Sequence, residues 1–209
     1  MSTAPLEHPN GSGPTGDQDS GEVVGVLLAA GAGRRAGGPK ALRVDPGGTF
    51  WLLRSIAVLL DGGCAAVLVV LGCAAEQALA IIDDAESDRR VTVAVATDWE
   101  SGMGASLRTG LVTVGARPWR AALVHLVDLP DVSVPVVRRV LDRAPADTGV
   151  LARATYGGRP GHPVLLGRDH LPSVVAELAG DRGAGDYLAR HGFDGVECGD
   201  LATGRDRDE

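Results

Sequence analysis

The order of apolar and polar residues along the chain is the feature that most constrains its fold. Four mostly apolar runs of strand length, at residues 25–30, 65–72, 91–95 and 121–128, alternate with segments in which apolar residues recur at helical spacing. Strands that are apolar on both faces are typical of a parallel sheet covered by helices on each side. The sequence therefore predicts a three-layer α/β/α domain with a mostly parallel, Rossmann-like sheet.

The rest of the chain completes this organisation. The turn GGRPG between residues 148–156 and 162–166 predicts a hairpin, and two short helices and a last strand follow over residues 169–198. We expect a single domain over residues 22–199. The first 21 residues are rich in Pro, Gly, Ser and Asp and predict a disordered tail, and residues 200–209 predict a flexible C-terminal tail.

The net charge and the cysteine content limit which binding partners and which cellular compartment we expect. A net charge of −7 does not favour nucleic acid, which needs a basic face. The longest apolar runs, near residues 23–33 and 65–75, are about half of the ~18 residues that indicate a membrane span. Three cysteines without a C-x-x-C pair predict reduced thiols rather than a zinc site. With no signal-peptide pattern at the N-terminus, we expect a cytoplasmic protein.

The loop after the first apolar run combines glycine with positive charge. Residues 31–40 read GAGRRAGGPK. Successive glycine N–H groups can wrap an anion because no Cβ blocks the approach. Arg35 and Lys40 would neutralise a polyphosphate, and Lys40 is the single Lys among 20 basic residues. An ammonium is a compact point charge suited to phosphate. The loop therefore predicts a triphosphate site at the mouth of the sheet.

Two other nucleotide loops fit this stretch less well. Gly33 and Gly38 have the spacing of a P-loop, but Lys40 is preceded by Pro39 and no Ser or Thr follows it to bind magnesium. Gly31 and Gly33 nearly open a dinucleotide fingerprint. However, the second strand ends in Leu-Gly-Cys, with no acidic residue to bind a ribose.

A second polar loop, Asp128-Leu-Pro-Asp131, follows the fourth apolar run. Carboxyl ends of parallel strands meet at one edge of a sheet, so this loop should face the glycine loop. A carboxylate there suits magnesium, which prefers hard oxygen ligands. Asp128 is the expected metal ligand, whereas Asp131 is expected in a turn or cap. His125, inside the apolar run, is expected to be a hydrogen-bonded core residue.

Five segments of the chain resemble one known family in order. They are LAAGAGRRAGGPK (28–40), DWESGMGASLRTGL (98–111), VDLPDV (127–132), YGGRPGHPVLL (156–166) and GDRGAGDYL (180–188). Together they are similar to the MobA-like NTP transferases, and most similar to the branch of molybdenum cofactor cytidylyltransferases. The sequence departs from that pattern at Ala36, at Leu129 in place of Gln, and at Gly185 in place of the usual Arg.

The resemblance implies a reaction and a set of site residues. It implies magnesium-dependent transfer of an NMP, CMP from CTP, to the phosphate of a small cofactor such as molybdopterin, with release of pyrophosphate. Catalytic roles fall to Lys40, Arg35 and Asp128, substrate contacts to His162 and Arg182, and metal ligation to Asp128 and Asp181. The implied nucleotide-binding residues are Leu28, Ala29, Ala30, Gly31, Gly33, Lys40, Gly104 and Ser106.

Several alternatives remain open at this stage. Gly104 and Ser106 also suit a helix start that packs its own turn, and His162 also suits a structural position beside Pro163. The acceptor could instead be a sugar phosphate or an alcohol phosphate. The chain could also be a non-catalytic nucleotide-binding accessory protein. If the cytidylyl-cofactor interpretation holds, a molybdoenzyme that receives the product is the expected protein partner.

Overall fold

A computed structural model describes residues 22–33, 37–85, 88–143 and 147–206. Its centre is one seven-stranded sheet with the order β3-β2-β1-β4-β6-β5-β7. Along the chain the strands are β1 (Val23–Ala29), β2 (Ala66–Leu71), β3 (Val91–Val95), β4 (Ala121–Leu126), β5 (Leu151–Tyr156), β6 (Arg159–Gly167) and β7 (Asp194–Glu197). The predicted tail before residue 22 and the last three residues lie outside the described part of the chain.

The pairing of the strands confirms the mostly parallel sheet. β1 pairs in parallel with β2 and β4, β2 with β3, and β5 with β7. β6 is antiparallel to both of its neighbours, β4 and β5. It returns from β5 through the turn Gly157-Gly158, whose φ angles of 59° and 74° need glycine. The predicted hairpin is therefore confirmed, and it places the one reversed strand beside β4.

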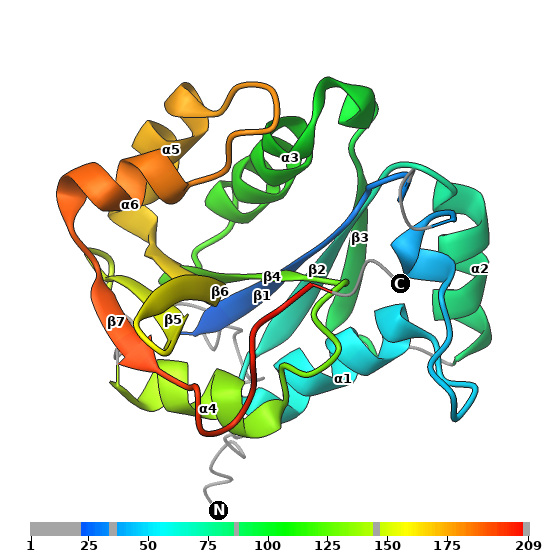
Figure 1. The fold of residues 1–209 in the computed structure, drawn as a ribbon. Helices are drawn as coiled ribbons and strands as arrows, with labels where there is room; N and C mark the ends of the chain where they lie inside the picture. Colours follow the sequence, from blue (N-terminus) through cyan, green and yellow to red (C-terminus); the bar gives the residue numbers. More distant parts are fainter. Residues whose placement is uncertain (1–21, 34–36, 86–87, 144–146, 207–209) are drawn as a thin grey trace, which may run out of the picture.

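Helices cover both faces of the sheet, as Figure 1 shows. On one face lie α1 (Trp51–Gly62), α2 (Ala75–Asp84) and α4 (Val134–Arg143). On the other lie α3 (Met103–Gly115), α5 (Leu171–Glu177) and α6 (Gly185–His191). Neighbouring residues of a strand point to opposite faces, so Val26 and Leu27 of β1 belong to different cores. The predicted three-layer architecture is confirmed, and no described helix is long and apolar enough to cross a membrane.

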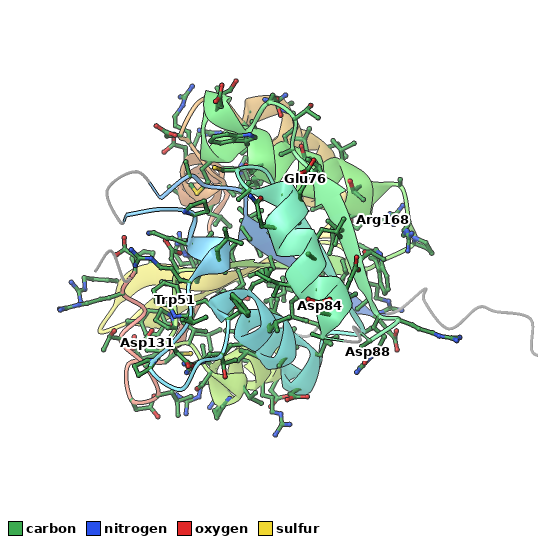
Figure 2. All side chains as sticks on the ribbon, turned by 90° about the vertical axis from the view of Figure 1, so that its right-hand side faces the viewer. Trp51, Glu76, Asp84, Asp88, Asp131 and Arg168 are labelled. Carbon is green, nitrogen blue, oxygen red and sulfur yellow. The ribbon has the colours of Figure 1, made fainter. Side chains whose placement is uncertain are left out.

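The carboxyl ends of β1 and β4 lie side by side. The Val127 N–H donates to the Leu28 carbonyl oxygen at 3.2 Å, just where both strands end. Figure 2 shows Trp51 and Asp131 toward this end of the sheet, and Asp88 and Arg168 toward the opposite end. The glycine loop and the DLPD loop therefore leave the sheet together, as expected for adjacent parallel strands.

Asp131 lies in a turn, as predicted. Its carboxylate also contacts a segment that is distant in the sequence. Its Oδ2 accepts hydrogen bonds from the Thr203 backbone N–H at 2.6 Å and the Thr203 hydroxyl at 2.5 Å. Leu201 and Ala202 pack against the core on the side of α1 and α4. These contacts fix the described part of the C-terminal segment across the carboxyl ends of the strands and bring Asp206 to the edge of the cleft described below.

The contact between α1 and α4 gives a test of the packing. A Cβ built at Gly62 would lie 2.6 Å from the Val137 Cβ. We expect Gly62→Ala to lower the free energy of unfolding by about 1–3 kcal/mol, because an overpacked core must move backbone or side chains. Gly115→Ala is the matched control, since a Cβ there meets nothing within 4 Å. It should be neutral or stabilising by up to ~1 kcal/mol. Equal effects of the two changes in denaturant unfolding would contradict this packing.

Candidate active site

A cleft of about 580 Å³ opens at the carboxyl ends of β1 and β4. Three pieces of chain form its walls: the glycine loop with Lys40, the segment that leads into α3, and the loop after β4. The lining residues are Leu28, Ala29, Ala30, Gly31, Ala32, Gly33, Lys40, Trp99, Glu100, Gly102, Met103, Ser106, Leu126, Val127, Asp128, Asp181 and Asp206. The volume lies within the range of ordinary small-ligand sites, about 300–1,000 Å³.

An ion pair joins the two loops at the floor of the cleft. The Lys40 Nζ donates to the Asp128 Oδ2 at 2.8 Å, and the two side chains are only 16% and 19% exposed. Lys40 begins the short helix η1 (Lys40–Leu42), and Asp128 lies two residues after β4. The structure thus brings together the cation and the carboxylate that the sequence places in separate loops, 88 residues apart.

The glycine loop is closed by a contact that only glycine permits. The Gly38 N–H donates to the Gly33 carbonyl oxygen at 3.2 Å. Gly33 has φ 56°, and a Cβ there would meet the Gly38 carbonyl carbon at 2.8 Å. Gly31 and Gly33 both line the cleft, and their predicted contacts to a nucleotide stay predictions. Arg35 lies outside the described residues, so its predicted phosphate contact stays a prediction.

Gly102 and Gly104, at the start of α3, position the wall of the cleft that this helix contributes. Gly104 donates its N–H to the Gly180 carbonyl oxygen at 2.9 Å, and a Cβ at Gly104 would meet that oxygen at 2.8 Å. Gly102, with φ 113°, has an equally tight position against Gly180. The start of α3 therefore packs directly on the loop that carries Asp181, and this packing puts Asp181 into the cleft. Gly104 acts through this packing and does not itself line the cleft.

The remaining predicted site residues line three different cavities. Ser106 is buried and lines the cleft. His162 lines a neighbouring cavity between the sheet and α6. Arg182 points into a third cavity, with Glu177 and Tyr187, beside α5 and α6. The predicted substrate contact of Arg182 therefore receives no support from its position.

Sequence reasoning missed several lining residues. Trp99 and Glu100 belong to the short helix η2 (Trp99–Ser101), and Met103 begins α3. Asp206 lines the cleft three residues after Thr203, whose backbone N–H donates to Asp131. For Trp99, Glu100 and Met103, the sequence pattern that could have identified them is the dipeptide Gly102-Met103. For Asp206 no local signal exists, because the contact that places it joins residues 72 positions apart.

The described cleft carries an excess of negative charge. Four acidic residues line it, Glu100, Asp128, Asp181 and Asp206, against one cation, Lys40. Among the described residues no group of three or more His, Cys, Asp or Glu side chains is arranged to hold a metal ion alone. Magnesium commonly binds one or two protein carboxylates and completes its shell with substrate phosphates and water. Asp128 and Asp181 fit that kind of donor set.

Two histidines, the buried His125 and the half-buried His162, lie next to residues that line the cleft or the cavity beside it. Burial, with a contribution from the Arg153 cation, lowers the pKa of His162 to about 4. Burial and the charge of His162 lower the pKa of His125 to about 3. The core position expected for His125 is confirmed at 1% exposure, but its Nδ1 has no hydrogen-bond partner in the described part of the chain. Both rings are neutral at pH 7.

Comparison with known proteins defines the class of this chain. The model of the MobA-like NTP transferase domain matches residues 25–196. The chain therefore belongs to the MobA-like NTP transferase family and is an enzyme of the transferase type. A curated relative, nicotine blue oxidoreductase of Paenarthrobacter nicotinovorans, is 39% identical over 203 residues, which cover 92% of this chain and 95% of the relative.

Solved structures agree with the family and the fold. Rv0371c from Mycobacterium tuberculosis H37Rv superposes with a TM-score of 0.69 at 27% identity, covering 86% of this chain and 89% of that one. The complex of the same protein with manganese gives a TM-score of 0.64 at 26% identity, covering 85% and 87%. The predicted family and the nucleotidyltransferase-type α/β fold are thereby confirmed.

The low pKa of His162 predicts how the free energy of unfolding depends on pH. The unfolded chain protonates this imidazole near its ordinary pKa of 6.5, whereas the native protein protonates it only near 4. Between these values the unfolded state binds more protons, so His162 lowers stability as pH falls from 7 to 5. We expect the free energy of unfolding to fall less over this range in His162→Phe than in the wild type. An imidazole NMR signal of His162 that titrates near 6.5 in the native protein would contradict the assignment.

Proposed function

We propose that this chain is a magnesium-dependent cytidylyltransferase. It transfers CMP from CTP to the phosphate of a small cofactor such as molybdopterin and releases pyrophosphate. The observation that carries the proposal is the Lys40–Asp128 pair in a glycine-walled cleft at the carboxyl edge of the sheet. We place the activity in the cytoplasm and treat residues 22–199 as the catalytic domain.

The reaction needs positioning and charge neutralisation more than an enzyme nucleophile. An oxygen of the acceptor phosphate attacks the α-phosphorus of the nucleotide. The new P–O bond forms as the bond to the pyrophosphate oxygen breaks, and pyrophosphate carries away the electron pair. Lys40 lies where its ammonium can neutralise charge on the phosphates. Gly31 and Gly33 line the same cleft, and N–H groups of this loop would bind phosphate oxygens.

A divalent cation suits the charge of this cleft. A nucleoside triphosphate adds about four negative charges to a lining that is already acidic. Asp128 and Asp181 would hold the ion through carboxylate oxygens. When bound, magnesium supplies electrostatic stabilisation of the transferring phosphoryl group. The manganese complex of the Rv0371c structure supports a divalent metal in this class of fold.

The choice of CTP and of the acceptor rests on the resemblance of the five sequence segments to the cytidylyl branch. Sugar or alcohol phosphates are the alternative acceptors for the same transfer. A non-catalytic nucleotide-binding role is less well supported, because the ion pair between Lys40 and Asp128 is intact. A molybdoenzyme that accepts the finished cofactor is the protein partner that this proposal implies.

A second candidate function is oxidoreduction. The observation that favours it is the 39% identity to nicotine blue oxidoreductase over nearly the whole chain. Gly31 and Gly33 resemble the start of a dinucleotide fingerprint, which a nicotinamide cofactor would use. Against it, β2 ends at Leu71 and continues into Gly72 and Cys73, so no carboxylate stands at the usual ribose position.

Replacement of Asp128 tests the transferase proposal. We expect Asp128→Asn to lower the rate of pyrophosphate release from CTP and molybdopterin by about 100-fold or more, because it removes charge that acts on the reacting phosphates. The affinity for the nucleotide should change much less. Asp84→Asn makes the same chemical change on the exposed surface of α2 (Figure 2) and should release pyrophosphate at the wild-type rate.

Each outcome of this assay separates the candidates. Wild-type turnover in Asp128→Asn contradicts the assigned role of the carboxylate. A wild-type protein that releases no pyrophosphate, but decolourises nicotine blue with a reduced nicotinamide dinucleotide, supports the oxidoreductase function instead. Nucleotide binding with neither activity would favour the accessory role.

A further inference from the structure

A cavity of about 290 Å³ lies at the end of the sheet opposite to the active-site cleft. It opens between the C-terminal end of α3 and the starts of β1, β2 and β3, and no described residue lines both this cavity and the cleft. In Figure 2, Asp88 and Arg168 mark this end of the molecule. The volume is close to the lower limit of ordinary small-ligand sites, about 300 Å³. The cavity therefore suits a ligand of about one ring.

The inner surface of this cavity is apolar. Trp119, Leu68 and Val114 line it, and all three are buried in the core beneath α3. Such a surface binds the hydrocarbon part of a ligand by removing apolar area from water, and it leaves no buried polar group of the protein without a partner. The inner surface therefore favours a ligand with an apolar body.

The rim of the cavity is positively charged. Arg89, Arg90 and Arg117 line it, and among the described residues no acidic side chain does. Arg90 is compensated by Asp88, whose Oδ2 accepts from its Nε at 2.9 Å and from its Nη2 at 2.6 Å. The guanidinium groups of Arg89 and Arg117 have no ion pair or hydrogen bond with any described residue. Because like charges around one small space repel each other, these two cations favour an anion between them.

The C-terminal end of α3 does not account for these two cations. The last carbonyl groups of a helix have no partner within the helix and carry partial negative charge, which a nearby cation stabilises. Arg168 already supplies that cation. It donates to the carbonyl oxygens of Gly115 at 3.3 Å, of Trp119 at 3.1 Å and of Arg117. The guanidinium groups of Arg89 and Arg117 are therefore left for a ligand, in a chain whose net charge is −7.

We propose that this cavity binds a small dianion carried on an apolar ring, such as an aromatic dicarboxylate or an aryl phosphate. Arg89 and Arg117 bind the anionic groups, because the planar guanidinium fork matches the oxygens of carboxylate and phosphate. The apolar inner surface holds the ring. These contacts use no residue of the nucleotide cleft, so the site does not depend on the proposed transfer reaction.

Phthalate and phthalamide form a matched pair of probes for the charge. Both carry two neighbouring carbonyl groups on a benzene ring, but only phthalate is a dianion at pH 7. In NMR titrations of the full-length protein without divalent cations, we expect phthalate to bind at least about tenfold more tightly, because charged hydrogen bonds are the stronger ones. The indole N–H signal of Trp119 should shift. Without a metal ion the acidic cleft is unfavourable for a dianion.

Two phosphates test the apolar part of the site and the kind of anion. Phenyl phosphate should bind at least about tenfold more tightly than inorganic phosphate, because its ring buries apolar area against the inner surface. The ratio of the phenyl phosphate and phthalate affinities then shows which anionic group the cavity prefers, and either order supports the dianion site. Equal binding of phenyl phosphate and inorganic phosphate would contradict the assigned role of the apolar surface.

The arginines are tested one at a time. Arg89→Gln and Arg117→Gln keep a polar side chain at an exposed position and remove its charge, so both variants should fold. Each should weaken phthalate binding at least about tenfold. Arg143→Gln is the matched control, since Arg143 is an exposed arginine at the end of α4, outside the cavity. It should bind phthalate as the wild type does.

Three results overturn the inference. They are equal binding of phthalate and phthalamide, no binding of either dianion, and wild-type affinity in both Arg89→Gln and Arg117→Gln. A phthalate-induced shift at the indole of Trp99 with none at Trp119 also overturns it, because Trp99 lines the cleft and Trp119 lines the cavity. None of these results depends on whether CTP binds.

Discussion

The ion pair between Lys40 and Asp128 is the interaction on which the account of this protein depends. It joins the loops after β1 and β4, two strands that lie side by side at the centre of the sheet. Both side chains are mostly enclosed, so loss of either one would break a charge pair that is largely shielded from water. The pair therefore brings together, in one cleft, the cation that we propose contacts phosphate and the carboxylate that we propose binds a metal ion.

Close backbone contacts set the geometry around this pair. Gly33 closes the glycine loop against Gly38, and Gly104 lets the start of α3 approach Gly180. The second contact brings Asp181 to the cleft that Asp128 also lines. The walls are thus positioned by main chain, which moves less than long side chains do. The acidic side chains that line the cleft would repel a polyphosphate, which supports the proposed role of a divalent cation.

Much of this arrangement could be predicted from local sequence patterns. Apolar runs of strand length identified the parallel strands, and the rule that strand ends share one edge brought Lys40 and Asp128 together. What local patterns could not supply was contact between distant segments. The hydrogen bonds from Thr203 to Asp131 bring Asp206 to the cleft, and the packing of Gly104 on Gly180 decides where Asp181 points. The same limit explains why Arg182, one residue further along, points elsewhere.

The central claim is that the cleft at the Lys40–Asp128 pair binds a magnesium nucleotide. Thermal unfolding of the wild-type protein with CTP, GTP, ATP and UTP, each with and without magnesium, tests it most directly. A ligand at 100 times its dissociation constant adds about 2.7 kcal/mol, or roughly 5–10 °C for a chain of this size. The account predicts an upward shift of that order with CTP that requires magnesium. No shift with any of the four nucleotides at millimolar concentration would contradict it.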